Sequence, residues 1–306
     1  MPVDQASFRP YQGVRHPGRG AIRAIAGTTI RRVMRRTWLR LMFVVIVLLN
    51  LVTTSIMSYF TNQEIAGGQT FGEILEQRGF GPLDPFAISM RGFIAQINLF
   101  SLVVAALTAA PLIAEDRRAR ALPLYFSRPI THVHYVLGKL AAAIFFLGAV
   151  LLVPPIAMFL YEIGNSPAEI EFGDRLGVLA DGLIPLGALT LALASISLGI
   201  SSLVERSNIA SLALFGLLLF ATVFSNATVE LITEDPRWYA LDPFYSAQAV
   251  AHHLLPEIPK LDLPARALPR QALQIPLSVA WSSLAGWTAL GVGLLVWRVR
   301  RVEVVE

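Results

Sequence analysis

Residues Gly182–Val204 read GLIPLGALTLALASISLGISSLV, a stretch that contains no Asp, Glu, Lys or Arg. A helix needs about 20 consecutive apolar residues to cross the hydrocarbon core of a bilayer, which is about 30 Å thick. The stretch is therefore typical of a transmembrane helix. Similar charge-free stretches occur at Leu41–Gln63, Gly92–Ala114, Leu140–Tyr161, Ser207–Val229 and Gln271–Trp297. The sequence predicts an all-α integral membrane protein with six transmembrane helices, because helices satisfy their own backbone hydrogen bonds in lipid.

These stretches also predict the domain organisation of the chain. We expect a flexible tail at 1–20, an interfacial helix at 21–37, a transmembrane domain at 38–300 and a short tail at 301–306. The expected spans are about 41–62, 92–114, 140–161, 182–204, 207–228 and 275–297. The pair Pro154-Pro155 should kink or locally unwind the third of them. The fifth and sixth spans are separated by the longest outer segment, 230–270. It is apolar in patches but too short to cross, which predicts an outer cap or a re-entrant element.

The distribution of charge predicts the orientation. The tails and the connections that follow the second and fourth spans hold 18 of the 25 Lys and Arg residues and only 6 of the 21 Asp and Glu residues. The other connections hold the remaining 7 basic and 15 acidic residues. Because basic segments stay in the cytoplasm, we expect both termini there. The pI of about 9.7 is then explained by topology, and no nucleic-acid partner is needed.

The residues before the first span are expected to form an amphipathic helix. Apolar residues recur at helical spacing at Ile22, Ala26, Ile30 and Val33. A cationic surface is supplied by Arg23, Arg31, Arg32, Arg35 and Arg36. This pattern suits a helix that lies in the membrane interface against anionic lipid head groups. The alternative is a basic flank that only sets the topology.

The sequence carries no pattern for covalent chemistry. It has no GxxxxGK[ST] phosphate loop and no HExxH metal motif, and it contains no cysteine. The adjacent pair His252-His253 lacks further ligands at helical spacing, so a solvated pair is favoured over a metal site. We therefore expect no catalytic residue, no metal and no bound cofactor. The glycines of the last span, Gly286, Gly291 and Gly293, are interpreted as points of close helix approach.

Polar groups inside the spans are limited to amides and hydroxyls. A proton-driven carrier would be expected to bury Asp, Glu or His within its spans, and the charge-free stretches hold no Asp, Glu or His. The amides Asn50, Gln96 and Asn98 are candidates for lining a translocation pathway. They could equally form hydrogen bonds between helices, each of which contributes about 0.6–2 kcal/mol in lipid.

The connection after the second span carries a recognisable pattern. Residues 112–131 read LIAEDRRARALPLYFSRPIT, and residues 135–139 read YVLGK. This resembles the signature of type-2 ABC exporter permeases, with an acidic entry, a short apolar helix, Ser-x-Pro-Ile and a Gly-Lys pair that opens the third span. The matching positions are Glu115, Leu122, Ser127, Pro129, Ile130, Gly138 and Lys139. The sequence departs from the pattern at Arg120-Ala121, where the family commonly has Gly-Thr, and at Pro123.

The resemblance implies that segment 115–139 contains a coupling helix seated on a separate ABC ATP-binding subunit. Apolar side chains rimmed by arginines at an edge that faces water fit such a partner. The interface residues that it implies are Glu115, Arg117, Arg118, Arg120, Leu122, Leu124, Tyr125, Phe126, Arg128 and Pro129. The alternative is an ordinary interfacial helix that rests on lipid.

The resemblance further implies a permease subunit of an ATP-driven exporter in a bacterial or archaeal cytoplasmic membrane. Two ATP-binding subunits and a second permease, identical or different, would complete the transporter, and ATP and Mg would bind to the partner subunits. Two other functions stay open. One is a channel or carrier that works without ATP, and the other is a subunit that transmits ATP-driven motion to an extracytoplasmic protein without moving a substrate. The sequence does not specify the substrate.

Overall fold

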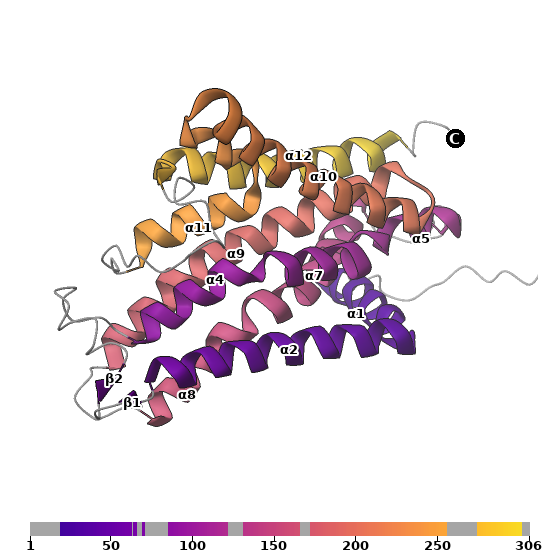
Figure 1. The fold of residues 1–306 in the computed structure, drawn as a ribbon. Coiled ribbons are helices and arrows are strands. Elements are labelled where there is room, and N and C mark those ends of the chain that lie inside the picture. The colour runs from indigo at the N-terminus through magenta and orange to yellow at the C-terminus, as the bar shows by residue number, and fades with distance from the viewer. Residues whose placement is uncertain are drawn as a thin grey trace, which may run out of the picture.

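The computed structural model describes residues 19–62, 64–65, 69–70, 85–121, 131–165, 172–255 and 274–301. These residues form a bundle of helices, which confirms the predicted all-α membrane fold (Figure 1). The described strands are the two-residue pair β1 (Glu64–Ile65) and β2 (Gln69–Thr70), which is antiparallel.

Five helical segments are long and apolar enough to span a membrane. They are Phe86–Arg118, His132–Gly164, Phe172–Leu203, Ser207–Thr233 and Leu277–Val299. A sixth candidate is the bent pair formed by α1 (Arg19–Arg35) and α2 (Thr37–Asn62), whose axes meet at 96°. The number of spans therefore agrees with the sequence prediction when this bent pair counts as one.

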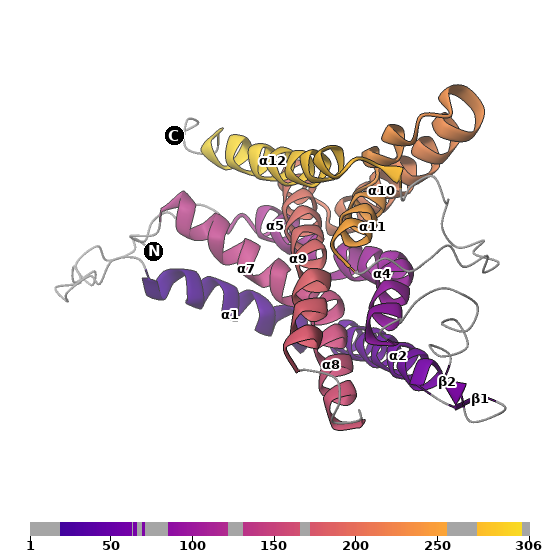
Figure 2. The ribbon, with the colours of Figure 1, turned by 90° about the vertical axis from the view of Figure 1, so that its left-hand side faces the viewer.

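The helices follow one another up and down the bundle. After α2 come α4 (Pro85–Val104), η3 (Ala105–Ala109), α5 (Pro111–Arg118), α7 (His132–Leu151), α8 (Val153–Asn165), α9 (Phe172–Leu203), α10 (Ser207–Thr228), η4 (Val229–Thr233), η5 (Pro236–Leu241), α11 (Pro243–Leu254) and α12 (Leu277–Arg301). One end of the bundle carries α1, α5 and the C-terminus, and we call it the α5 end; the opposite end carries β1 and β2 (Figure 1). The longest helix, α9, runs through the middle and contacts helices on every side (Figure 2).

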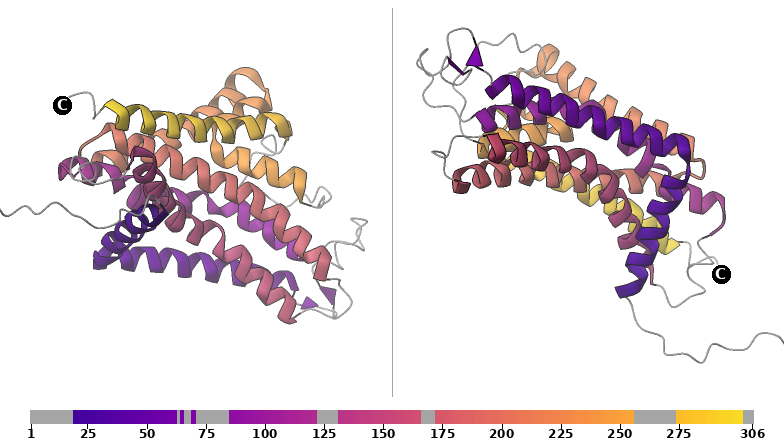
Figure 3. Two further views of the ribbon diagram at one scale, coloured as in Figure 1. Left: turned by 180° about the vertical axis from the view of Figure 1, so that it is seen from behind. Right: turned by 90° about the horizontal axis from the view of Figure 1, so that it is seen from below.

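Helix α1 lies across the α5 end and packs on α7 (Figure 3, right). The buried face of α1 consists of Ile25, Thr29 and Val33. Close contact is possible because residue 138 of α7 is a glycine: a Cβ atom there would lie 2.7 Å from the Cβ atom of Ile25. Of the predicted apolar face, only Val33 is fully buried, and Ile22, Ala26 and Ile30 are half-buried. The buried face is centred on Ile25 because α1 packs against α7.

Two prolines divide the third span into α7 and α8, as their position predicts. Pro154 has no N–H group, so the carbonyl of Val150 loses its usual helical donor. The side chain of Asn50 in α2 replaces that donor, because its Nδ2 atom donates to the Val150 oxygen at 2.9 Å. Asn50 is fully buried in this position. This amide therefore serves the packing of α2 against the kinked third span.

Several helices begin earlier than the charge-free stretches predict. Helix α7 begins at His132 and not near 140, and α9 begins at Phe172 and not near 182. The added turns contain charged side chains, and the two that are buried, Arg175 and Lys139, have partners. Arg175 donates to the carbonyl of Glu162 at 2.9 Å, and Lys139 lies 2.7 Å from a carboxylate oxygen of Asp116. A search for uncharged residues ends at such paired charges and therefore does not detect the first turns of these helices.

The described part of the outer segment folds back into the bundle. Helix α11 contacts α9, α12 and α4, and η5 contacts α10 and α12. Asp242 begins α11 as its N-cap: its carboxylate accepts hydrogen bonds from the Phe244 N–H at 2.7 Å and from the Thr222 hydroxyl at 2.5 Å. Residues 256–273 of the predicted outer segment lie outside the described residues.

Candidate functional site

The segment predicted to dock a partner, 115–139, is described at its two ends, 115–121 and 131–139. Four predicted interface residues lie in the first of these: Glu115, Arg117, Arg118 and Arg120. The other six lie outside the described residues: Leu122, Leu124, Tyr125, Phe126, Arg128 and Pro129. The contacts of the first four define the candidate site.

A buried network of charges connects the two ends of this segment. The carboxylate of Asp116 in α5 is 0% exposed, and Lys139 in α7 is 1% exposed. The Lys139 Nζ atom lies 2.7 Å from Asp116 Oδ2 and also donates to the carbonyl of Leu112 at 3.1 Å. The Tyr135 hydroxyl donates to Asp116 at 3.0 Å. Because a buried charge is stable only with partners, this network fixes α5 and α7 to each other.

Helix α1 joins the same network. The Arg32 guanidinium lies 2.7 Å from Asp116 Oδ1, so one carboxylate binds cations from two other helices. At the surface, Arg36 pairs with Glu115 at 2.6 Å. The predicted interface residue Glu115 is thus already paired with the residue that directly follows α1. Helices α1, α5 and α7 form one connected unit, which we call the coupling unit.

A second set of contacts connects α5 to the turn between α9 and α10. Helix α5 begins with Pro111 and follows the π-helical turn η3. The hydroxyl of Ser201 in α9 accepts hydrogen bonds from the Ile113 and Ala114 N–H groups of α5 at 3.0 and 2.9 Å. Arg117 donates to the carbonyl of Ser202 at 2.8 Å and pairs with Glu205 at 3.2 Å. The predicted interface residue Arg117 is therefore mostly buried and holds the helices together.

Helix α5 ends in a Schellman motif. The Arg120 N–H donates to the Arg117 carbonyl at 3.0 Å, and the Ala121 N–H donates to the Asp116 carbonyl at 2.9 Å. Arg120 has φ of 48°, the left-handed conformation that glycine adopts without strain. This is the position at which the permease signature commonly has glycine. The departure from the signature at Arg120 therefore places a non-glycine residue in a conformation that carries an energetic cost.

We expect Arg120→Gly to stabilise the protein by up to about 1 kcal/mol. A non-glycine residue in the left-handed region costs about 1–2 kcal/mol, which glycine avoids. Part of this gain is lost because glycine raises the conformational entropy of the unfolded chain. Thermal unfolding of the purified protein measures the change. Arg120→Ala is the matched control, since it removes the same charge and keeps the strain. An equal gain in both variants would assign the effect to charge.

The exposed arginines gather at a pocket of about 770 Å³ at the α5 end. It is lined by Arg117, Arg118, Arg120, Glu205, Arg206, Ser207, Asn208 and Ile209. Arg118, Arg120 and Arg206 are exposed, while Arg117 forms the inner wall. The structure therefore brings the three predicted arginines to one pocket and adds Arg206 from the turn between α9 and α10. Such a surface favours acidic groups.

The three amides considered for a pathway have separate partners. Asn50 binds the α7 backbone, as described above, whereas the Asn98 side-chain oxygen accepts a hydrogen bond from Gln248 of α11 at 3.3 Å. Gln96 is half-buried, and its Nε2 atom has no partner among the described residues. A pathway-lining role for these amides stays a prediction.

Two residues that hold α5 in place, Asp116 and Ser201, were missed by the sequence interpretation. Asp116 stands between two predicted interface residues but was not selected, and Ser201 lies in a stretch interpreted only as a span. The available signal was the helical spacing of Tyr135 and Lys139, which places both on one face of α7. Their carboxylate partner in α5 follows only from the tertiary structure.

Comparison with known proteins agrees with this architecture. The family model described as ABC-2 family transporter protein matches residues 23–299. A search of curated proteins found no match. The match to the family model covers α5, α7 and the five candidate spans other than the bent pair, and all of α1 except its first four residues. This multi-pass membrane protein therefore belongs to the ABC-2 family of transporter proteins, as an ABC permease, and its membership implies association with an ABC ATP-binding subunit.

Proposed function

We propose that this chain is the permease subunit of an ATP-driven exporter and that its α5 end faces the cytoplasm. The excess of basic residues in the segments at this end supports the orientation. Two copies of a separate ATP-binding subunit, which hold ATP and Mg, would drive a pair of permeases. The chain itself would do no covalent chemistry and would bind no cofactor.

The observation that carries the proposal is the buried pairing of Asp116 with Lys139. These residues flank the segment 122–130, and they join the end of the second span to the start of the third. A partner that displaces this segment must therefore move both spans together. Because Arg32 of α1 also pairs with Asp116, α1 would move together with the two spans. This arrangement suits the transmission of motion from an ATPase to the membrane domain by alternating access between the two permeases.

The ATP-binding subunit would dock over segment 122–130 and the arginine-lined pocket. Arg118 and Arg120 are exposed there, and charge complementarity would guide an acidic surface of the partner. Glu115 and Arg117 would support the docking surface from within, because both already bind other helices.

Affinity purification of the tagged chain in mild detergent, with mass spectrometry of its partners, tests the proposal. We expect a stoichiometric protein with a Walker motif. Recovery of the permease alone, also after chemical crosslinking, would favour a channel or carrier that works without ATP. Stimulation of the ATPase only by an extracytoplasmic protein would favour the subunit that transmits motion without moving a substrate.

We expect the double substitution Arg118→Glu and Arg120→Glu to reduce co-purification of the ATPase at least about tenfold, since like-charge contacts at an interface cost several kcal/mol. Arg117 is left unchanged because it holds α5 to the turn after α9. Arg23→Glu with Arg31→Glu is the matched control, since both arginines are exposed and lie on α1. Unchanged co-purification in the first variant would exclude the pocket from the interface.

A further inference from the structure

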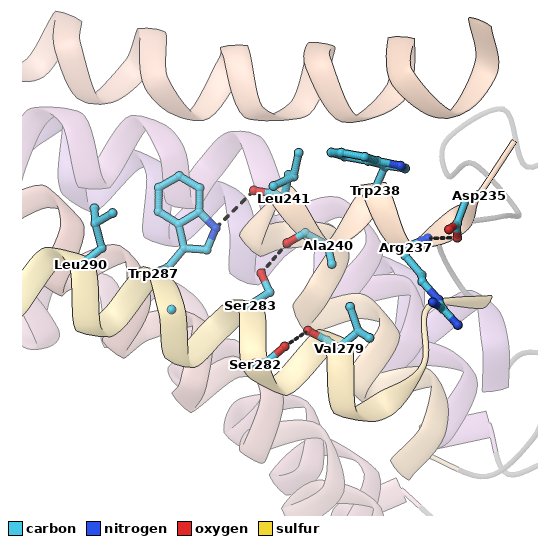
Figure 4. A pocket seen from close by; sticks show the side chains of 11 residues that line it. Asp235, Arg237, Trp238, Ala240, Leu241, Val279, Ser282, Ser283, Trp287 and Leu290 are labelled. Carbon is cyan, nitrogen blue, oxygen red and sulfur yellow. Dashed lines mark hydrogen bonds between the residues drawn. The ribbon is translucent and has the colours of Figure 1, made fainter. Parts of the chain in front are cut away.

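A groove of about 680 Å³ lies between η5 and α12, away from the coupling unit (Figure 4). Its volume is within the range of about 300–1,000 Å³ that is common for small-molecule sites. One wall of the groove is formed by α12, a candidate membrane span, so we expect its contents to come from the lipid phase.

The two ends of the groove differ in polarity. Asp235, Arg237 and Trp238 lie at one end, and Trp287 and Leu290 lie at the other (Figure 4). The Arg237 side chain is exposed, and its guanidinium has no partner among the described residues. The groove thus offers a charged mouth and an apolar body, which is the pattern that an amphiphile requires.

The walls of the groove are held by internal hydrogen bonds. The Ser283 hydroxyl donates to the carbonyl of Ala240, and the Trp287 Nε1 atom donates to the carbonyl of Leu241 at 3.2 Å. The Ser282 hydroxyl donates to the carbonyl of Val279 within α12 at 2.8 Å. Because these polar groups already have partners, the body of the groove favours an apolar occupant.

The length of the groove is close to the hydrocarbon thickness of one leaflet of a bilayer. Its lining on α12 extends from Val279 to Leu290, which corresponds to about 16 Å at a rise of about 1.5 Å per residue. The hydrocarbon core of a bilayer is about 30 Å thick, so the groove covers about half of it. Val279 lies close to the start of α12 at Leu277, which places the mouth at the end of the bundle that carries β1 and β2.

We propose that this groove binds one phospholipid, with its phosphate at Arg237 and one acyl chain along α12. A zwitterionic head group such as phosphoethanolamine suits the mouth better than a purely anionic one, because Asp235 would repel further negative charge and attract the ammonium group. The inference does not depend on the ATP-driven mechanism, and its test contains no ATPase.

The test is photocrosslinking of the full chain in nanodiscs that contain phosphatidylethanolamine with a diazirine on the acyl chain. We expect the label to concentrate on residues 279–290 and to exceed several-fold the label on the exposed lipid-facing side of α10. Gly286→Leu should fill the groove and abolish this excess, and the variant should fold because no atom lies within 4 Å of a Cβ atom at Gly286. Gly293→Leu is the control, since this site on α12 is equally open and does not line the groove.

Further outcomes separate the parts of the proposal. Arg237→Gln should weaken retention of phosphatidylethanolamine, and unchanged retention would overturn the phosphate contact. Equal labelling of α10 and α12, or unchanged labelling in Gly286→Leu, would overturn the acyl-chain site. Because the chain has no cysteine, Leu290→Cys gives a single thiol. A disulfide between two such chains would show that a second copy covers the groove, which would also overturn the proposal.

Discussion

Replacement of Asp116 by asparagine is expected to lower the free energy of unfolding by about 3–5 kcal/mol, the usual cost of removing one partner of a buried ion pair. The shape of the side chain is conserved, but the buried Lys139 ammonium then loses the negative charge of its partner and keeps uncharged acceptors such as the Leu112 carbonyl. The ion pair between Arg32 and Asp116 is also lost. Thermal unfolding in detergent should show the loss as a large decrease in Tm.

Glu115→Gln is the matched control for this prediction. Glu115 is the neighbouring carboxylate and pairs with Arg36, the residue that follows α1, but its side chain is 18% exposed and that of Arg36 is 52% exposed. Ion pairs accessible to water contribute about 0–1 kcal/mol, so this variant should remain close to the original protein. Equal losses in the two variants would contradict the importance of the buried network.

The double variant Asp116→Asn with Lys139→Met separates stability from coupling. It removes both members of the buried pair, so no unpaired lysine remains, and much of the lost stability should return. Arg32 is 47% exposed and can turn to water. Under the proposed function, this variant should still bind the ATPase, but motion of the partner would reach α7 less effectively. Spin labels on single cysteines in α5 and α7 would then show a broader distance distribution than in the original protein.

Much of the fold follows from local sequence signals. The charge-free stretches predict the membrane helices, and Pro154-Pro155 predicts the break between α7 and α8 because proline lacks the N–H group that a helix requires. The contacts that build the candidate site cannot be predicted from such local signals. Asp116 pairs with Arg32 over 84 positions of sequence, and Ser201 binds the Ala114 N–H over 87 positions. Side chains whose partners lie so far away in the sequence cannot be distinguished from ordinary flanking or span residues without the tertiary structure.

The glycines of the last span illustrate the same limit. All three of Gly286, Gly291 and Gly293 fit the pattern of close helix approach, yet only Gly291 lies against another backbone. A Cβ atom at Gly291 would overlap the backbone of Ser195 and Ile196 in α9, whereas Gly286 and Gly293 face open space. Spacing identifies small residues along a helix, but only the position of α9 shows which of them is needed.

Gly291→Leu is accordingly expected to prevent α12 from packing on α9, and Gly291→Ala should already lower stability by about 1–3 kcal/mol, the usual cost of overpacking. Gly199 of α9 lies at the same contact between the two helices, because a Cβ atom there would lie 2.8 Å from the Gly291 carbonyl oxygen. The backbones of α9 and α12 are thus in close contact from both sides, and a side chain at either glycine would push them apart. Gly293→Ala and Gly293→Leu are the matched controls on α12. Size-exclusion chromatography after heating should show aggregation of the Gly291 variants at lower temperatures than either control. Similar melting of Gly291→Leu and Gly293→Leu would mean that α12 does not cross α9 at this glycine.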